Sequence, residues 1–213
     1  LCTVKGDYVI HFMSSHPRDF TKKVIDVIRD NPQISRQIHL PVQAGNDRIL
    51  KEMNRHYTIE QYMDIINYAK EQIQGVTFST DIIVGFPGET FEEYLDTERL
   101  VKEVRFTQIF NYRYSKRNGT PAAAMPQLSN AIKDERAKRL GAAAAEIRKE
   151  YLLKQVGKVY EVLFETEHPK FSEGYTKNYT PVRIYDGKDR KGKFINVLIT
   201  DAGDDYCVGI EAT

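Results

Sequence analysis

VTFSTDIIVGFPGET, from Val76 to Thr90, is the stretch that decides the fold. Its first nine residues, up to Val84, are nearly all apolar, Thr or Ser, as in a strand buried within a parallel sheet. Glycines and a proline then make a tight turn. Thr90 and Glu93 have the spacing of a capping box, which marks the start of a helix. The stretch therefore predicts a strand–turn–helix unit.

The same alternation continues on both sides of this unit. Three more strands are predicted, at Tyr8–Met13, Ile38–Val42 and Phe106–Tyr114. Helices are predicted around residues 24–28, from Thr58 to just before Gly75, and over 129–153 with Ser129 as N-cap. Strands alternating with helices favour an α/β fold with a parallel sheet, in which ligands bind beyond the carboxyl ends of the strands.

A second kind of pattern begins at Gly157. Five short strands separated by turns follow in fewer than sixty residues, which favours a small closed all-β barrel. We place the boundary near Lys154, with an α/β domain over residues 1–154 and the barrel over residues 155–213.

The overall composition excludes several classes of protein. The 213 residues are 41% hydrophobic and carry a net charge of +1, so a nucleic-acid partner must use a local patch. The apolar runs are too short to cross a bilayer, and we expect a cytoplasmic protein without a membrane partner. The two cysteines, Cys2 and Cys207, form neither a disulfide framework nor a metal-ligand pattern.

Three polar residues are candidates for ligand binding at the carboxyl ends of the strands. Gln43 ends a strand, where its amide could hydrogen-bond to a sugar diol or merely cap a turn. The guanidinium of Arg55 could form a bidentate ion pair with a carboxylate, or be solvated. Asp81 lies within an apolar strand and needs a partner, which a ribose, a lysine or backbone amides could supply. Gly85 and Pro87 allow a flat ligand to approach, although a tight turn needs similar residues.

Basic residues beside aromatic ones are candidates for RNA contacts, with solvated loops and core tyrosines as the alternative. Lys116 and Arg117 follow the last strand of the α/β part. The barrel, with eight basic and ten acidic residues, is not basic overall. Its local candidates are Tyr175, Lys177, Tyr179, Arg183, Lys188, Arg190, Lys191 and Lys193. The long helix could widen the patch with Lys133, Arg136, Lys138, Arg139, Arg148 and Lys149.

HLPVQAGNDRILKEMNRHYT (39–58), STDIIVGFPGET (79–90) and YSKRNGTPAA (114–123) resemble the methylthiotransferase branch of radical S-adenosylmethionine (SAM) enzymes. SSHP (14–17) resembles the enzymes that make 2-methylthio-N6-isopentenyladenosine in tRNA. The resemblance implies a partial TIM-like radical SAM barrel followed by a TRAM domain, an RNA-binding module. It also implies that Gln43, Arg55 and Asp81 bind SAM, with Gly85 and Pro87 along its adenine.

The resemblance further implies an activity for the complete protein. It would add a methylthio group to C2 of an N6-modified adenosine next to the anticodon, using SAM and two [4Fe-4S] clusters. Its partners would be the tRNA anticodon stem-loop and a reducing donor such as flavodoxin or ferredoxin, and we expect a monomer. The stretch EGYTKNYTPVRI (173–184) leaves open N6-threonylcarbamoyladenosine as the substrate.

One departure from the family pattern is decisive for this chain. The CxxxCxxC motif that holds the SAM-cleaving cluster is absent, and one thiolate cannot replace three cluster ligands. We therefore assign no catalytic residue and no metal ligand. We expect the chain to be the C-terminal part of a longer enzyme, inactive by itself and able at most to bind SAM and RNA.

Overall fold

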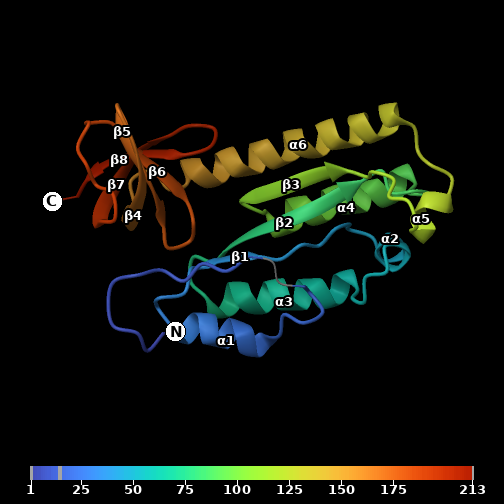
Figure 1. The fold of residues 1–213 in the computed structure, drawn as a ribbon, viewed down its shortest axis with the longest axis horizontal. Helices are drawn as coiled ribbons and strands as arrows, with labels where there is room; N and C mark the ends of the chain where they lie inside the picture. Colours follow the sequence, from blue (N-terminus) through green and yellow to red (C-terminus); the bar gives the residue numbers. More distant parts are fainter. Residues whose placement is uncertain (1, 14–15, 213) are drawn as a thin grey trace.

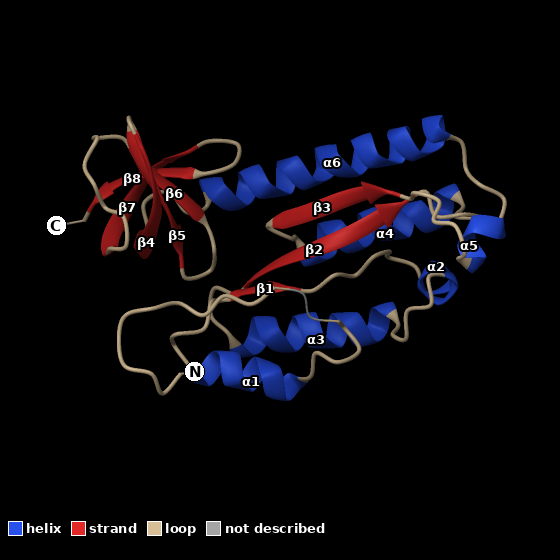
Figure 2. Ribbon diagram, in the orientation of Figure 1, coloured by secondary structure: helices blue, strands red, loops and turns tan. Residues whose placement is uncertain are grey.

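The computed structural model describes residues 2–13 and 16–212, so Ser14 and Ser15 of the SSHP motif lie outside the described residues. A parallel sheet with its helices forms one part of the molecule, and a small barrel forms the other (Figures 1 and 2). The long helix α6 (Asn130–Leu153) leads from the first part to the second. Residues 154–158 then join α6 to the first barrel strand.

The sheet has the order β1-β2-β3 and is parallel throughout. Its strands are β1 (Gln37–His39), β2 (Thr77–Val84) and β3 (Gln108–Arg113). The prediction of a strand at Tyr8–Met13 is wrong. Only Ile10 pairs, in an isolated bridge with Ile34, because the segment around Ile34 is an irregular loop. β1 is also shorter than predicted, because the chain shifts register before the isolated bridge between Gln43 and Ile82.

The helices begin where the sequence predicts. Side chains of Thr58 and Thr90 form complete capping boxes, and the Ser129 hydroxyl accepts from the Ile132 N–H. The helices of the first part are α1 (Lys22–Asp30), α2 (Asp47–Glu52), α3 (Ile59–Gln72), α4 (Phe91–Val104) and the short α5 (Pro121–Ala124).

The two faces of the sheet differ in chemistry. Ile38, Phe78, Ile82 and Val84 pack into one buried core with residues of α1, α3 and α4. Alternate positions project to the opposite face because successive strand side chains point in opposite directions. These positions carry polar groups, namely Gln37, His39, Ser79 and Asp81.

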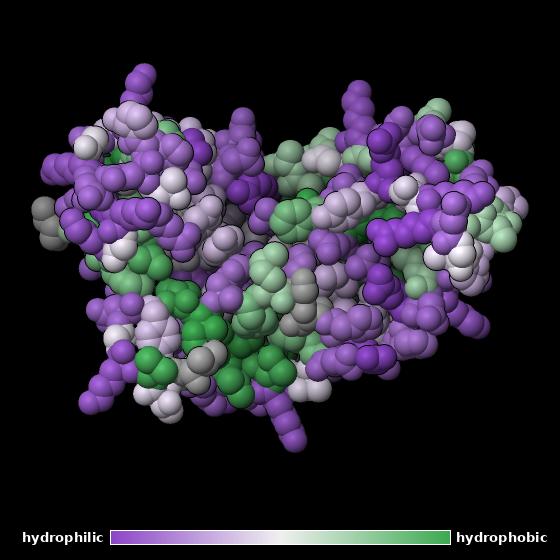
Figure 3. Space-filling model, viewed as in Figure 1, coloured by the Kyte–Doolittle hydropathy of each residue, from purple (hydrophilic) through white to green (hydrophobic). Residues whose placement is uncertain are grey.

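Apolar side chains also gather on the surface around α1 (Figure 3). Phe12, Phe20, Val24, Ile28 and Ile34 line a groove there, and Val27 beside it is 52% exposed.

The five predicted barrel strands are all present, and they close into a barrel of order β4-β5-β6-β8-β7. They are β4 (Val159–His168), β5 (Phe171–Thr176), β6 (Pro181–Ile184), β7 (Phe194–Ala202) and β8 (Cys207–Glu211). Val162, Phe164, Val182 and Val197 form its separate core. The barrel lies at the amino ends of β1–β3, away from the arrowheads in Figure 1.

Candidate functional site

Gln43 lies where the chain leaves the sheet at the carboxyl end of β1. Its backbone adopts a left-handed φ of 70°, which is uncommon outside glycine. Its N–H donates to the Asp81 carbonyl, and its own carbonyl accepts from the Ile83 N–H, both at 2.9 Å. Gln43 is 9% exposed as a residue, and no hydrogen bond joins its side-chain amide to a residue that the structure describes. The amide is not among the buried polar atoms that lack a partner, so it remains open to a ligand.

Arg55 follows α2 and is only partly exposed. Its Nε is buried and has no hydrogen-bond partner, and its guanidinium forms no ion pair with an acidic group of residues 2–13 or 16–212. Burial, and then the positive charge of Arg55, lower the pKa of His16. Burial raises the pKa of Tyr57, which also lies near Arg55, to about 12. The Arg55 guanidinium is therefore a cation without an acidic partner among the described residues, and it suits an anionic ligand group.

Asp81 is the acidic member of this group. Its side chain is 28% exposed, and the basic side chain described nearest to it is His39, whose Nε2 lies 3.7 Å from Asp81 Oδ2. That separation is longer than a hydrogen bond. Neither a lysine nor a backbone amide of the described chain satisfies this carboxylate, so those two alternatives for the partner of Asp81 are wrong.

The glycine-rich turn beside this group has a packing explanation of its own. Gly85 has a φ of +72°, and a Cβ added there would lie 2.6 Å from Lys133 Cγ. Its N–H donates to Glu89 Oε2 at 2.8 Å, and the buried carboxylate of Glu89 pairs with Arg136. Pro87 is buried in the same turn. The turn is thus fixed by α6, and contact of Gly85 and Pro87 with an adenine stays a prediction.

Most basic side chains of α6 are buried or bonded to other groups of the protein. The expectation that these side chains widen an RNA patch is therefore wrong. Lys133 and Arg136 are 7% and 6% exposed. Arg139 pairs with Glu98, and Arg148 donates to Asp205 and to the Thr107 carbonyl. These side chains hold α6 against the rest of the protein. Lys138 is exposed, and Lys149 lies 3.5 Å from Asp204 on the surface.

Arg190 is a second correction. It is 2% exposed, because its guanidinium is enclosed by Asp186 and Glu211, and it cannot reach an RNA phosphate. Arg183 donates to Glu173 at 2.6 Å and lies over the Tyr206 ring. Other predicted cations are exposed, namely Lys116 and Arg117 at the carboxyl end of β3, and Lys188, Lys191 and Lys193 on the barrel.

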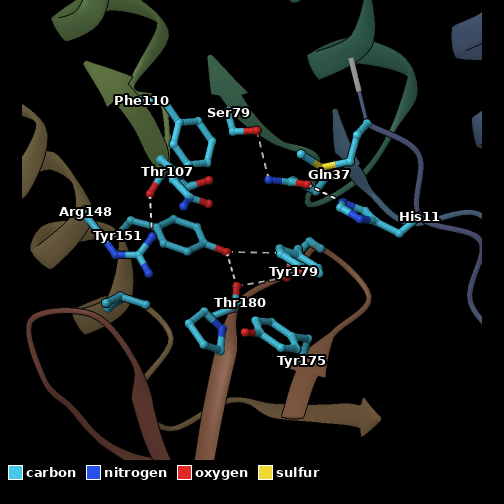
Figure 4. A pocket seen from close by; sticks show the side chains of 15 residues that line it. His11, Gln37, Ser79, Thr107, Phe110, Arg148, Tyr151, Tyr175, Tyr179 and Thr180 are labelled. Atoms are coloured by element: carbon cyan, nitrogen blue, oxygen red, sulfur yellow. Dashed lines mark hydrogen bonds between the residues drawn. The ribbon is translucent and has the colours of Figure 1, made fainter. Parts of the chain in front are cut away.

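Tyr179 lies in the joint between the two parts of the molecule (Figure 4). Its ring stacks with His11 at 4.3 Å and with Tyr175 at 4.4 Å, which leaves it unsuited to the predicted base stacking. The neighbouring Lys177 carbonyl accepts from the Arg36 N–H at 2.7 Å. A cavity of about 260 Å³ adjoins this joint, between the amino ends of the strands, α6 and the barrel.

The buried polar residues on the face of the sheet opposite its apolar core were not predicted from the sequence. Gln37, His39 and Ser79 are buried and hydrogen-bonded to one another across β1 and β2. Their signal is the alternation of polar with apolar residues in QIHL (37–40) and TFSTDI (77–82). Among the described residues, no group of three His, Cys, Asp or Glu side chains could hold a metal ion. No described helix is both long and apolar enough to cross a membrane.

Comparison with known proteins gives the class of protein that the chain resembles. Residues 3–101, which contain β1 and β2, match the family model of the radical SAM superfamily. Coproporphyrinogen III oxidase (HemN) from Escherichia coli, described as a radical SAM enzyme, shares the fold with a TM-score of 0.56. That match covers 96% of this chain and 52% of the other, at 15% identity.

The particular relatives are proteins named tRNA-2-methylthio-N(6)-dimethylallyladenosine synthase. The one from Clostridium beijerinckii is 46% identical over 97% of this chain and 46% of its own length. Those from Fusobacterium nucleatum and Caldicellulosiruptor saccharolyticus are 42% and 39% identical over 94% and 97% of this chain. The chain spans about half the length of these curated relatives, 47% and 44% for the latter two.

Proposed function

We propose that the chain is the SAM-binding and RNA-binding part of a tRNA methylthiotransferase. One observation carries the proposal: Gln43 beyond β1, Arg55 beyond α2 and Asp81 in the second half of β2 are polar residues without a side-chain hydrogen bond to a described residue. By contrast, nearby Arg48 forms a complete ion pair with Glu93. Polar groups that are left open together mark a ligand site.

The chemistry of these groups fits SAM. The Arg55 guanidinium suits the carboxylate of its methionine moiety, the Asp81 carboxylate accepts from ribose hydroxyls, and the Gln43 amide both donates and accepts. SAM beside a [4Fe-4S] cluster supplies radical chemistry, and in the family a second cluster holds the sulfur. This chain's own task is placement, since a radical acts only on an atom held close to it. Gly85 and Pro87 would border the adenine.

The proposed substrate is a tRNA anticodon stem-loop, with C2 of N6-isopentenyladenosine as the atom modified. The names of the relatives favour this nucleoside over N6-threonylcarbamoyladenosine. We propose that residues 1–154 are part of a TIM-like radical SAM barrel and that residues 155–213 are a TRAM domain. Lys188, Lys191 and Lys193 would contact RNA phosphates there, and Lys116 and Arg117 at the other end of the sheet. A cytoplasmic monomer served by flavodoxin or ferredoxin completes the proposal.

The distance between the two sets of cations is compatible with one RNA. β2 has eight residues, which extend about 26 Å at about 3.3 Å per residue, and the barrel and the carboxyl-end loops lie beyond its two ends. A stem-loop can bridge such a span, with phosphate contacts positioning it and the site at the carboxyl ends receiving the base.

Mass spectrometry of tRNA nucleosides from a strain lacking the gene tests this function. We expect 2-methylthio-N6-isopentenyladenosine to disappear and its unthiolated precursor to accumulate. Loss of the methylthio group from N6-threonylcarbamoyladenosine instead would change the substrate. Unchanged nucleosides would contradict the proposed activity.

A further inference from the structure

Four polar side chains form a continuous chain along the ligand-facing side of the sheet. His11 Nε2 lies 2.6 Å from Gln37 Oε1, and Gln37 Nε2 lies 3.0 Å from Ser79 Oγ (Figure 4). Ser79 Oγ in turn lies 2.8 Å from His39 Nδ1. The chain starts beside the barrel, where His11 stacks on Tyr179, and runs toward Asp81.

The amide atoms of Gln37 set the direction of two of the three hydrogen bonds in this chain. The Gln37 Oε1 atom can only accept, so His11 Nε2 carries the hydrogen, and the Gln37 amide donates to Ser79 Oγ. Ser79 Oγ, which accepts from Gln37, retains one hydroxyl hydrogen, and His39 Nδ1 is the acceptor within reach among the described residues. When Ser79 donates to Nδ1, the hydrogen of a neutral His39 ring lies on Nε2, the atom that faces Asp81.

The surroundings of His39 keep this donor aimed in one direction. The ring is 3% exposed and meets the Phe110 ring edge-on at 5.8 Å, so it cannot turn to solvent. Its Nε2 lies 3.7 Å from Asp81 Oδ2, about 0.9 Å beyond the length of a good charge-assisted bond. Such contacts are often long without ligand and tighten on binding.

We propose that His39 is a positioning residue for Asp81. The donor chain fixes His39 as the Nε2–H tautomer, and this N–H holds one carboxylate oxygen of Asp81, so that the other oxygen faces the ligand. The ligand class is a vicinal diol such as a ribose, and this part of the inference rests on the proposed function. Donors that point the same way along a chain strengthen one another, which is why Ser79 and Gln37 contribute to the orientation.

Long-range ¹H–¹⁵N spectra of the histidine side chains test the tautomer in the chain itself, without any ligand. We expect His39 to be in the Nε2–H form in the wild-type protein. Ser79→Ala should give a mixture of tautomers, whereas Ser172→Ala, which removes a hydroxyl bonded to a carbonyl in the barrel, should leave His39 unchanged. A wild-type His39 in the Nδ1–H form would overturn the inference, whatever the ligand is.

A double-mutant cycle tests the effect on the ligand, using SAM titrations of the cluster-containing protein. His39→Phe should weaken SAM binding about tenfold, the scale of one hydrogen bond to a charged group. His39→Gln, which retains an N–H donor, should recover part of this loss. In an Asp81→Ala background, His39→Phe should have no further effect.

The outcomes separate the two proposals. If Asp81→Ala weakens SAM binding and His39→Phe adds its full effect to it, His39 acts independently and the positioning role fails. If Asp81→Ala leaves SAM binding unchanged in a folded protein, the proposed SAM site fails, and with it the ligand assigned to His39.

Discussion

Replacing Arg190 with methionine separates a structural cation of the barrel from the cations proposed to bind RNA. Arg190 is 2% exposed and donates to both Asp186 oxygens at 2.6 Å and to Glu211 Oε1 at 2.5 Å and 2.9 Å. Methionine fills a similar volume and removes these bonds. Lys191→Met is the matched control, because Lys191 is exposed.

The magnitude follows from the burial of the three groups. Removing one partner of a fully buried ion pair costs about 3–5 kcal/mol, and an exposed pair contributes about 0–1 kcal/mol. Asp186 and Glu211 are 34% and 47% exposed, so water screens the charges that remain, and we expect about 2 kcal/mol. For a domain of this size that lowers the Tm of the barrel by about 8–16 °C. Lys191→Met should change stability by less than about 0.5 kcal/mol.

Acid adds a second signature of the same ion pair. Hydrogen bonds from Arg190 lower the pKa of Asp186 to about 2. A carboxyl whose pKa is lower in the folded state stabilises the protein above its unfolded pKa, and this contribution is lost as the pH falls from about 4 toward 2. Arg190→Met should remove most of that component of the acid dependence and leave the smaller part that comes from the Lys188 N–H bond to Asp186.

Calorimetry across pH, with filter binding of an anticodon stem-loop, measures both properties. An Arg190→Met variant with the Tm of the wild-type protein would refute the reasoning. So would a variant with unchanged stability and weakened RNA binding.

Three further predictions concern other parts of the chain. Reversing Lys188, Lys191 and Lys193 to Glu, with Arg190 left intact, should weaken stem-loop binding and reduce the log–log salt slope by up to about 2–3, since each phosphate contact contributes about 0.7–0.9; wild-type affinity and slope would show an ordinary solvated turn. Gly85→Ala should destabilise the protein more than Gly119→Ala. Alanine at either position costs about 1–2 kcal/mol because both have a left-handed φ, but only the Cβ at residue 85 also meets Lys133. An equal loss of unfolding free energy in chemical denaturation would contradict the packing. Cys207 should resist Ellman's reagent in the native protein while Cys2 reacts, because burial raises the pKa of the Cys207 thiol to about 11; two fast thiols at pH 8 would contradict this.

Local sequence signals predicted the elements that depend on neighbours along the chain. The capping box at Thr90, the helix start at Thr58 and the apolar run of β2 depend on residues within one element, and each appears where expected. The five barrel strands and their closure were also predictable from short apolar runs and turns. The shortening of β1 was not, because the left-handed backbone of Gln43 has no signal in a residue that is not glycine.

Contacts between residues far apart in the sequence limit how much of the candidate site can be predicted. From the sequence, Arg190 is predicted to be a surface cation. Closure of the barrel places it beside Glu211, which is 21 residues away along the chain. Tyr179 is predicted from the sequence to stack on a base. In the structure the joint between the two parts places His11 on its ring. Gln43, Arg55 and Asp81 are predicted as a group only through the motifs that carry them, and their role in binding SAM stays a prediction. That they lack partners is visible only in the structure.

Titration of SAM into the cluster-containing protein tests the central claim most directly. Arg55→Ala and Asp81→Ala should each weaken binding about ten- to hundredfold, which corresponds to about 1.5–3 kcal/mol for a charge-assisted contact. Arg48→Ala is the control, because that arginine is already paired with Glu93 and should leave SAM affinity unchanged. Wild-type affinity in both site variants, with the fold intact by circular dichroism, would contradict the claim that the open polar groups at the carboxyl end of the sheet bind SAM.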